Sequence, residues 1–293
     1  MKKDIKKFKT KSSFIEEKKS KKIFKKKIEE ISSLANQKVK RLFKLSKDAK
    51  FRQTENIIVI DGCREIEEAL KNSWSIDEFY FCEKFIIEKD RSAFVKIKEK
   101  ANHLISLSPA AFEKVSYKKN PDGFLALSQV KYQKFSDLKL KKNPLVVVLE
   151  SVEKPGNLGA IIRTAYASGV DLIILNDQKT DLYSPNVIRS STGFIFSMPL
   201  VLSSVSDTIK WLKKENIKIL TTSLSAEKNH FEIDFKLGTA IVFGSEAFGL
   251  SDLWLKGQVE QIKIPMISGV DSLNVSVSVA IIIYEAIRQR KYF

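Results

Sequence analysis

Residues 145–169 read LVVVLESVEKPGNLGAIIRTAYASG: an apolar run, a turn that contains Pro155 and Gly156, and a helix-forming stretch. A helix that starts directly after a strand offers free backbone N–H groups and the positive end of its dipole to an anion. The stretch nevertheless lacks both the G-x-G-x-x-G and the G-K-[ST] pattern of the common phosphate loops. Asn157 and Arg163 stand out as polar residues in a helix that otherwise looks buried. We therefore treat them as the first candidates for a functional site.

The charge of the chain is concentrated at one end. The 293 residues are enough for two domains with hydrophobic cores, and 51 basic against 35 acidic residues give a net charge of +16. Residues 1–50 hold 19 Lys and Arg against 6 Asp and Glu, so the remaining body is nearly neutral. A basic tail of this kind predicts a polyanionic partner, most often nucleic acid, with a solubilising extension as the alternative.

Several classes of protein are disfavoured by composition. Cys63 and Cys82 lie in apolar segments without metal-like spacing, which indicates two reduced core thiols. Two histidines are too few for a histidine-based metal site, so we expect no metal. No apolar run reaches 18 residues and the N-terminus lacks the apolar core of a signal peptide. We expect a cytoplasmic protein that does not span a membrane.

The first part of the chain predicts a tail followed by a small α/β domain. We expect residues 1–30 to be a disordered basic tail and residues 31–130 to form an N-terminal domain. A helical apolar period runs over residues 31–45. The further expected helices are 64–71 and 93–101, and the expected strands are 56–60, 78–82, 103–107 and 123–130.

A polar, basic linker at 131–143 separates this domain from a second alternating block at 144–293. Its expected strands are 145–149, 172–175, 198–202, 217–221, 240–243 and 261–264, and its expected helices are 158–167, 207–214 and 275–290. Short apolar strands with intervening helices predict a parallel, doubly wound sheet. Ligands of such sheets bind beyond the carboxyl ends of the strands, where the loops after Leu149, Thr221, Phe243 and Ile264 should converge.

Two further loops resemble the first in position. FGSEAFGLSD (243–252) follows a strand with glycines on both sides of Ser245 and Glu246, and IPMISGVDSLNVSV (264–277) runs from a strand end into the last helix. Glycines after strands let a ligand approach the backbone closely. Each loop alone could be a turn with a helix cap, whereas three such loops at strand carboxyl ends favour a binding site.

In this order and spacing, PGNLGAIIRTA, IVFGSEAFGLSD and IPMISGVDSLNVSVSVAIIIYEA resemble the three motifs of the SPOUT-class (TrmH/SpoU-type) RNA 2′-O-ribose methyltransferases. The similarity covers residues 146–290 and includes YSPNVIRSSTGFIFSMP, while ISSLANQKVKRLFKL and NPDGFLAL resemble the family's N-terminal RNA-binding domain. The resemblance implies methyl transfer from S-adenosylmethionine to a ribose hydroxyl. It also implies a homodimer and a C-terminal sheet tied in a deep trefoil knot, which periodicity could not have indicated.

The resemblance also assigns residues to the cofactor. Gly244, Ile264 and Leu273 match cofactor-contacting positions of the family, and the loop after Thr221, which begins with Thr222, lines the same pocket. An adenine ring needs an apolar slot with few polar groups, which Ile264, Met266 and Leu273 can supply.

Five polar residues match the family's functional positions: Arg163, Asn157, Glu246, Ser272 and Asn274. Asn157 could instead be only a helix N-cap, Ser272 could cap the last helix with Asn274 in its first turn, and Glu246 could be a solvated loop acid. Arg163 and Asn157 would reach the target ribose. A guanidinium with its usual pKa above about 12 is a poor base, so the role given to Arg163 is to clamp a phosphate and stabilise negative charge.

One departure from the family concerns the residues before Pro155. Glu153 and Lys154 stand where the family usually has acidic and Asp/Asn-type residues, which adds a cation beside the expected RNA groove.

The resemblance favours ribosomal RNA over tRNA as the substrate, because ribosomal members of the family commonly carry an N-terminal α/β RNA-binding domain of this length, whereas several tRNA members lack it. The alternatives are a tRNA 2′-O-methyltransferase and a non-catalytic RNA-binding or ribosome-assembly factor on the same scaffold. A dinucleotide-dependent oxidoreductase is disfavoured because G-x-G-x-x-G is absent.

Overall fold

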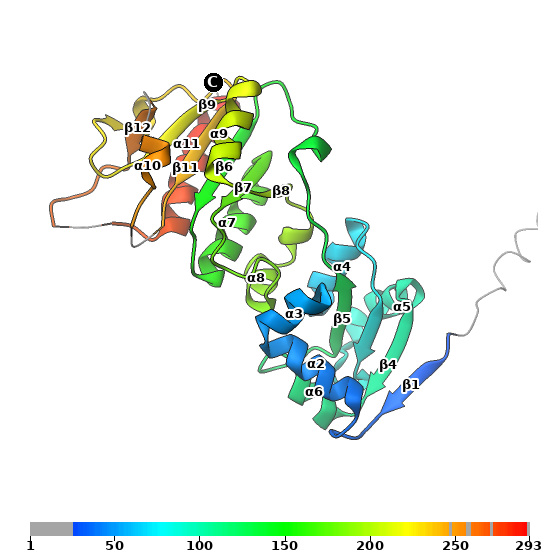
Figure 1. The fold of residues 1–293 in the computed structure, drawn as a ribbon. Helices are drawn as coiled ribbons and strands as arrows, with labels where there is room; N and C mark the ends of the chain where they lie inside the picture. Colours follow the sequence, from blue (N-terminus) through cyan, green and yellow to red (C-terminus); the bar gives the residue numbers. More distant parts are fainter. Residues whose placement is uncertain (1–25, 246–247, 256–258, 270–271, 292–293) are drawn as a thin grey trace, which may run out of the picture.

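The computed structural model describes residues 26–245, 248–255, 259–269 and 272–291. It contains two α/β units, each built on one sheet (Figure 1). The N-terminal sheet has the strand order β1-β4-β3-β5-β2, and the C-terminal sheet has the order β10-β12-β9-β11-β6-β7-β8. The predicted α/β class is confirmed.

The N-terminal sheet is mixed. Its strands are β1 (Ile28–Ile31), β2 (Ile57–Asp61), β3 (Glu78–Phe81), β4 (His103–Leu107) and β5 (Phe124–Gln129). β5 pairs antiparallel with β2 and β3, whereas β4 pairs parallel with β1 and β3. The helices are α2 (Gln37–Lys47), α3 (Ala49–Glu55), α4 (Cys63–Lys71), α5 (Arg91–Lys100) and α6 (Pro109–Val115), with short 3-10 turns η1 (Glu83–Phe85) and η2 (Glu88–Asp90).

Helices cover both faces of this sheet. Leu42 and Leu45 of α2 and Phe112 of α6 are fully buried in a core on one face. Ile66 of α4 and Ile97 of α5 are buried on the other face, in a core that continues into the C-terminal unit. The N-terminal unit is therefore a three-layer sandwich with α2 and α6 on the side away from that shared core.

Two expectations about the N-terminal region were wrong at their boundaries. The tail expected at 1–30 extends too far, because Ile28 to Ile31 pair with Leu104 to Leu107 as strand β1; residues 1–25 lie outside the described residues. The helix expected from residue 31 begins at Gln37, because Asn36 caps it by accepting the backbone N–H of Lys38 at 2.8 Å.

All strands of the C-terminal sheet pair in parallel, as expected. They are β6 (Leu145–Glu150), β7 (Leu172–Asn176), β8 (Leu200–Ser203), β9 (Lys218–Thr222), β10 (Lys228–Asn229), β11 (Thr239–Phe243) and β12 (Glu260–Lys263). The helices are α7 (Pro155–Ser168), α8 (Pro185–Ser190), α9 (Val205–Lys214), α10 (Asp252–Leu255) and α11 (Val275–Lys291), with 3-10 turns η3 (Phe135–Asp137), η4 (Phe194–Phe196) and η5 (His230–Glu232).

The C-terminal sheet is also covered on both faces. Ile161 of α7 and Ile282 of α11 are buried in the core shared with the N-terminal unit, and α7 packs against α11. Leu212 of α9 and Trp254 of α10 are buried in a separate core on the opposite face. No helix in the described ranges is long and apolar enough to cross a membrane.

The two units meet at a buried, partly charged interface. Arg52 of α3 donates from Nη2 and Nε to Oδ2 of Asp181, at 2.6 and 3.1 Å. Trp74 packs edge-on against Tyr183 and Phe196, with centroid distances of 5.6 and 5.0 Å. The N-terminal unit thus packs against the segment around α8, and α8 in turn packs against α7.

The expected linker packs against the C-terminal unit. Phe135 stacks on Trp211 of α9 at a centroid distance of 4.5 Å, and the side chain of Gln133 accepts the N–H of Leu200 at 3.0 Å.

Candidate active site

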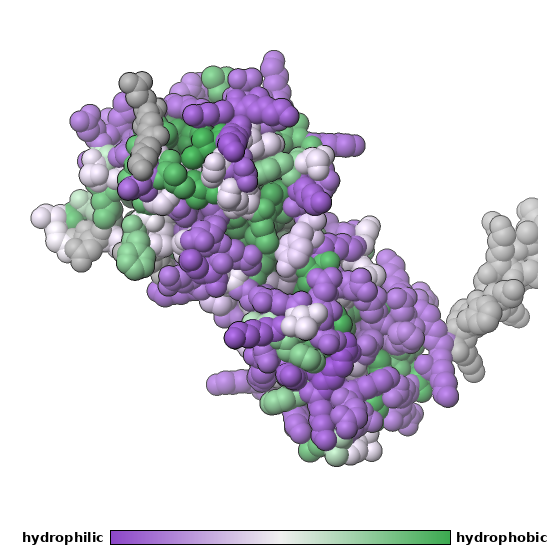
Figure 2. Space-filling model, viewed as in Figure 1, coloured by the Kyte–Doolittle hydropathy of each residue, from purple (hydrophilic) through white to green (hydrophobic). Residues whose placement is uncertain are grey.

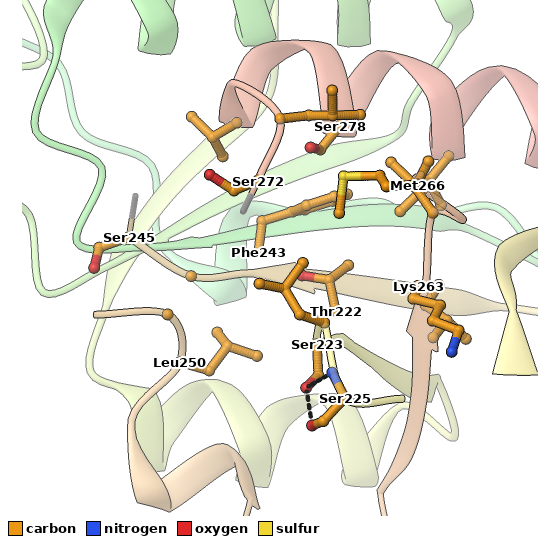
Figure 3. A pocket seen from close by; sticks show the side chains of 18 of the residues that line it. Thr222, Ser223, Ser225, Phe243, Ser245, Leu250, Lys263, Met266, Ser272 and Ser278 are labelled. Carbon is orange, nitrogen blue, oxygen red and sulfur yellow. Dashed lines mark hydrogen bonds between the residues drawn. The ribbon is translucent and has the colours of Figure 1, made fainter. Parts of the chain in front are cut away.

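A cavity of about 620 Å³ opens at the carboxyl ends of β9, β11 and β12 (Figure 3). Its wall combines apolar side chains with hydroxyl groups, which come from the ends of these strands and from the start of α11. The apolar lining residues include Phe243, Leu250, Ile264, Met266 and Leu273, and the hydroxyl-bearing ones are Thr222, Ser223, Ser225, Ser245, Ser272 and Ser278.

The positions expected to bind the cofactor all lie at this cavity. Thr222, Gly244, Ile264, Met266 and Leu273 line it. They come together because β9, β11 and β12 are neighbours in the parallel sheet, so their following loops emerge at one edge. Of the four loops expected to converge, only the one after Leu149 contributes nothing to the lining; it leads instead into α7.

The loop after β11 is held as a compact turn. Ser245 and Gly249 exchange backbone hydrogen bonds of 3.0 and 3.1 Å, with Gly249 at a φ of +67°. A Cβ on Gly244 would lie 2.2 Å from the carbonyl carbon of Gly249, so only glycine fits there. The carboxylate of Glu150, at the end of β6, accepts the N–H of Ser251 at 2.8 Å. Glu246 belongs to this loop and lies outside the described residues.

Asn274 joins the cavity to α7. Its Oδ1 accepts the backbone N–H of Ser276 at 2.9 Å, which caps α11, and its Nδ2 donates to Oδ1 of Asn157 at 3.2 Å. The alternative in which Ser272 caps α11 is therefore wrong: Asn274 has that position, and Ser272 lines the cavity. The cap alternative for Asn157 is also wrong, because α7 begins at Pro155.

Arg163 lies on the outside of α7. The apolar residues around Arg163 are buried as expected, since Ile161, Ile162 and Ala165 face the core, whereas Arg163 itself is exposed. The helical period turns residue 163 away from its apolar neighbours. Arg163 is not a lining residue of the cavity, so the structure does not bring it into direct contact with the expected cofactor positions.

Sequence reasoning missed several lining residues. Ser223, Ser225 and Ser278 face the cavity, and Ser223 and Ser225 share a hydroxyl–hydroxyl contact of 2.9 Å. The segment TTSLS (221–225) could have indicated Ser223 and Ser225, because it places a cluster of hydroxyl side chains at the end of an expected strand. In the described part of the chain, no three His, Cys, Asp or Glu residues are grouped to hold a metal ion.

Each of the two units matches a known protein family. Residues 144–284 match the SpoU rRNA Methylase family, and residues 36–126 match the MRM3-like substrate binding domain. The 23S rRNA (guanosine(2553)-2′-O)-methyltransferase of Bacillus subtilis is 30% identical over 88% of this chain and 98% of its own length.

Two solved structures share the whole fold. The crystal structure of an RNA 2′-O ribose methyltransferase is 35% identical, with a TM-score of 0.78, over 89% of this chain and 98% of that one. The AdoMet-bound rRNA methyltransferase of Sinorhizobium meliloti is 25% identical, with a TM-score of 0.80 and the same coverage.

The chain belongs to the SpoU rRNA methylase family. The predicted class, an S-adenosylmethionine-dependent RNA 2′-O-methyltransferase, is confirmed. The cavity fits this cofactor, because its apolar side chains suit an adenine ring and its hydroxyl groups suit a ribose and an amino-acid group.

Proposed function

We propose that this enzyme methylates a ribose 2′-hydroxyl of ribosomal RNA and does so at the junction between the cavity and the N-terminal end of α7. The hydrogen bond of 3.2 Å between Asn274 and Asn157 carries the proposal, because it joins the third motif to the first. The substrate class rests on the 23S rRNA specificity named for the Bacillus subtilis relative, which matches both units.

The cofactor half of the site is formed by Thr222, Gly244, Ile264, Met266 and Leu273. S-adenosylmethionine supplies an electrophilic methyl group when bound there. The side chains of Ile264, Met266 and Leu273 exclude water from one wall, and the compact turn at Gly244 presents backbone groups to the ligand. Ser272 lies at the cavity edge, beside Asn274.

The RNA half of the site is formed by the outer side of α7. Arg163 is exposed there and supplies a positive charge to the phosphate next to the target ribose. Asn157 holds the ribose through its amide, with its orientation fixed by Asn274. Glu246 and Ser272 are the remaining polar residues of the proposed site, and Glu246 lies outside the described residues.

The same proposal includes a homodimer, a knotted C-terminal domain and a cytoplasmic location. Tyr166 on α7 and Val277 and Tyr284 on α11 are exposed, and apolar side chains on two helices packed together suit a subunit interface. The path of the chain supports the knot, because after β12, near one edge of the sheet, it returns to α11 against α7.

A methyl-transfer assay tests the function. Purified protein and labelled S-adenosylmethionine are incubated with ribosomal RNA and, separately, with tRNA, and the modified nucleotide is mapped. We expect label at one ribose of ribosomal RNA. Label only in tRNA would move the substrate to the other class. Folded protein that binds the cofactor but labels no RNA would favour the non-catalytic assembly factor.

A further inference from the structure

Three lysine–aromatic pairs form one surface on the N-terminal unit, away from the cavity. Lys44 Nζ lies 4.2 Å from the ring centroid of Phe51, Lys47 Nζ 5.7 Å from that of Tyr117, and Lys114 Nζ 5.9 Å from that of Phe43. The six residues come from α2, α3, α6 and the segment after α6. We call them the lysine–aromatic surface.

No described residue neutralises the charge of this surface through an ion pair. Among the described residues, no carboxylate lies within 4.0 Å of Lys44, Lys47 or Lys114. On the same helix α2, by contrast, Lys38 pairs with Glu29, and Arg41 pairs with Glu55 and Glu78. The N-terminal half of α2 is therefore ion-paired, and its C-terminal half presents uncompensated positive charge.

Two of the three rings on this surface, Phe43 and Tyr117, are not needed by the core, whereas Phe51 is partly buried and packs against it. Leu42 and Leu45 supply the buried face of α2, whereas Phe43 and Tyr117 are 38% and 36% exposed. Lysine stems often pack on rings that are themselves buried, as Lys98 does on Phe81 and Phe94. Phe43 and Tyr117 remain accessible, so these two rings can contact a partner as well as the lysines.

The surface is continuous with the helices that lead to the active site. α2 packs against α3 and α6, Arg52 of α3 bonds Asp181 just before α8, and α8 packs against α7 (Figure 1). Arg189 on α8 and Arg163 on α7 are both exposed along this path. Figure 2, in the same view, shows this side as largely hydrophilic, with small apolar areas over α2 and α3.

We propose that the lysine–aromatic surface binds an unpaired segment of the substrate RNA, so that the target nucleotide reaches α7. The inference rests on the proposed function. Lys44, Lys47 and Lys114 neutralise phosphates, and Phe43 and Tyr117 stack on unpaired bases, the combination typical of single-strand binding. A folded protein partner would instead require a larger apolar area and fewer uncompensated lysines.

The first test removes the charge. In the full-length chain, Lys44, Lys47 and Lys114 are replaced together by Gln, and binding to ribosomal RNA is titrated at several salt concentrations. We expect about tenfold weaker binding at low salt and a salt slope smaller by about 2, because each phosphate contact on a single strand contributes about 0.7. The matched control replaces Lys89, Lys96 and Lys100, which are exposed at or near α5 on the opposite face of the sheet.

The second test removes the rings. We expect the double variant Phe43→Ala, Tyr117→Ala to bind RNA about tenfold more weakly with an unchanged salt slope, because stacking releases no counterions. The matched control is Ile87→Ala, Val95→Ala, which removes exposed apolar groups on the opposite face. Melting temperature and cofactor affinity are measured for every variant and should equal those of the wild type, which excludes misfolding as the cause.

The outcomes separate this inference from the proposed function. Wild-type protein that methylates no RNA contradicts the function, whatever the variants do. Active wild-type protein with surface variants that bind RNA like their controls overturns the inference alone. Variants that keep RNA affinity but no longer co-sediment with ribosomal particles would assign the surface to a ribosomal protein, and this too would overturn the inference.

Discussion

Arg163 and Asn157 occupy one helix in different ways. Asn157 accepts a hydrogen bond from the amide of Asn274 and belongs to the junction with the cavity, whereas Arg163 is exposed about 1.7 turns further along the helix. The two residues therefore differ in their surroundings. The amide of Asn157 is oriented by a hydrogen bond within the protein, whereas the guanidinium of Arg163 remains accessible to RNA.

Arg163→Ala should therefore abolish turnover and leave cofactor affinity within about threefold of the wild type, less than about 1.4 kcal/mol. Arg163 is not a lining residue of the cavity, so we expect its removal to affect the proposed RNA contacts and not the cofactor. Single-turnover methylation and calorimetric titration of S-adenosylmethionine provide the two readouts. Arg163→Lys is the control and should retain partial activity, since it keeps the charge without the planar fork. An equal loss of cofactor binding would show that Arg163 serves the other half of the site.

Gly244→Ala should have the opposite effect. The new Cβ would lie 2.2 Å from the backbone of Gly249, so the turn that closes the cavity has to open. We expect cofactor affinity to fall by about tenfold or more, about 1.4 kcal/mol. Gly156→Ala, where a Cβ meets no atom within 4 Å, is the matched control for calorimetry. Unchanged cofactor affinity in the Gly244 variant would mean that this turn adapts without affecting the ligand.

Among the elements, most apolar strands were predictable, even strands of four residues such as β3 and β12, whereas the short helices were not. The runs at 145–149 and 240–243 are β6 and β11 within a residue or so, because five or six consecutive buried residues leave few alternatives. Helices α3, α6, α8 and α10 were missed because each has seven residues or fewer, too short to show a period.

The candidate site could be predicted only in part from the residues. The apolar and glycine positions at strand ends indicated a pocket, but the identity of its ligand came from the resemblance of the three motifs. The bond between Asn274 and Asn157 joins positions 117 residues apart, and no local pattern predicts such a contact. The exposure of Arg163 could have been read from the helical period, had the Ile-Ile-Arg stretch not suggested burial all around.

The side chain of Asn274 caps α11 and also donates to Asn157, and substitutions can separate these two contacts. Asn274→Ala should lower the free energy of unfolding by about 1 kcal/mol, because α11 loses its cap. Asn274→Ser should restore that stability, since serine caps well, but it is too short to reach Asn157. We expect both variants to lose methyl-transfer activity, with chemical denaturation and single-turnover kinetics as the measurements. Wild-type turnover in the serine variant would show that the contact with Asn157 contributes nothing to the reaction.

For the molecule as a whole, the relative position of the two units depends on a largely buried ion pair. The side chains of Arg52 and Asp181 are 7% and 19% exposed, and Arg52 also donates to the carbonyl of Leu45 at 2.6 Å. This pair links α3, which packs against α2, to the segment just before α8, which packs against α7.

Asp181→Ala should lower the free energy of unfolding by about 3 kcal/mol, because it leaves the buried guanidinium without its carboxylate. It should also increase the radius of gyration, measured by small-angle scattering, as the interface loosens. Glu83→Ala is the control, because it breaks an exposed pair with Arg91 and should cost less than about 1 kcal/mol. A variant with wild-type stability and dimensions would locate the rigidity of the interface in Trp74 and its aromatic neighbours instead.

The basic tail can be deleted only as far as the first residues that contact the N-terminal sheet. Residues 1–25 carry 11 lysines and 3 acidic residues, a net charge of +8. Lys26 donates to the carbonyl of Glu99 at 2.7 Å, and strand β1 begins at Ile28, so a deletion through residue 30 would also remove a sheet edge. Removing residues 2–25 avoids this damage.

We expect that deletion to weaken RNA binding at low salt and to flatten the dependence of log K on log salt, because each phosphate contact releases counterions. The methylated nucleotide and the cofactor affinity should stay the same, since the cavity and the lysine–aromatic surface are intact. Filter binding across salt concentrations measures the RNA affinity and its salt slope, and mapping of the 2′-O-methyl group identifies the methylated nucleotide. An unchanged slope would leave the tail as a solubilising extension, whereas a changed target nucleotide would make it a determinant of specificity and contradict its role as a general polyanion-binding segment.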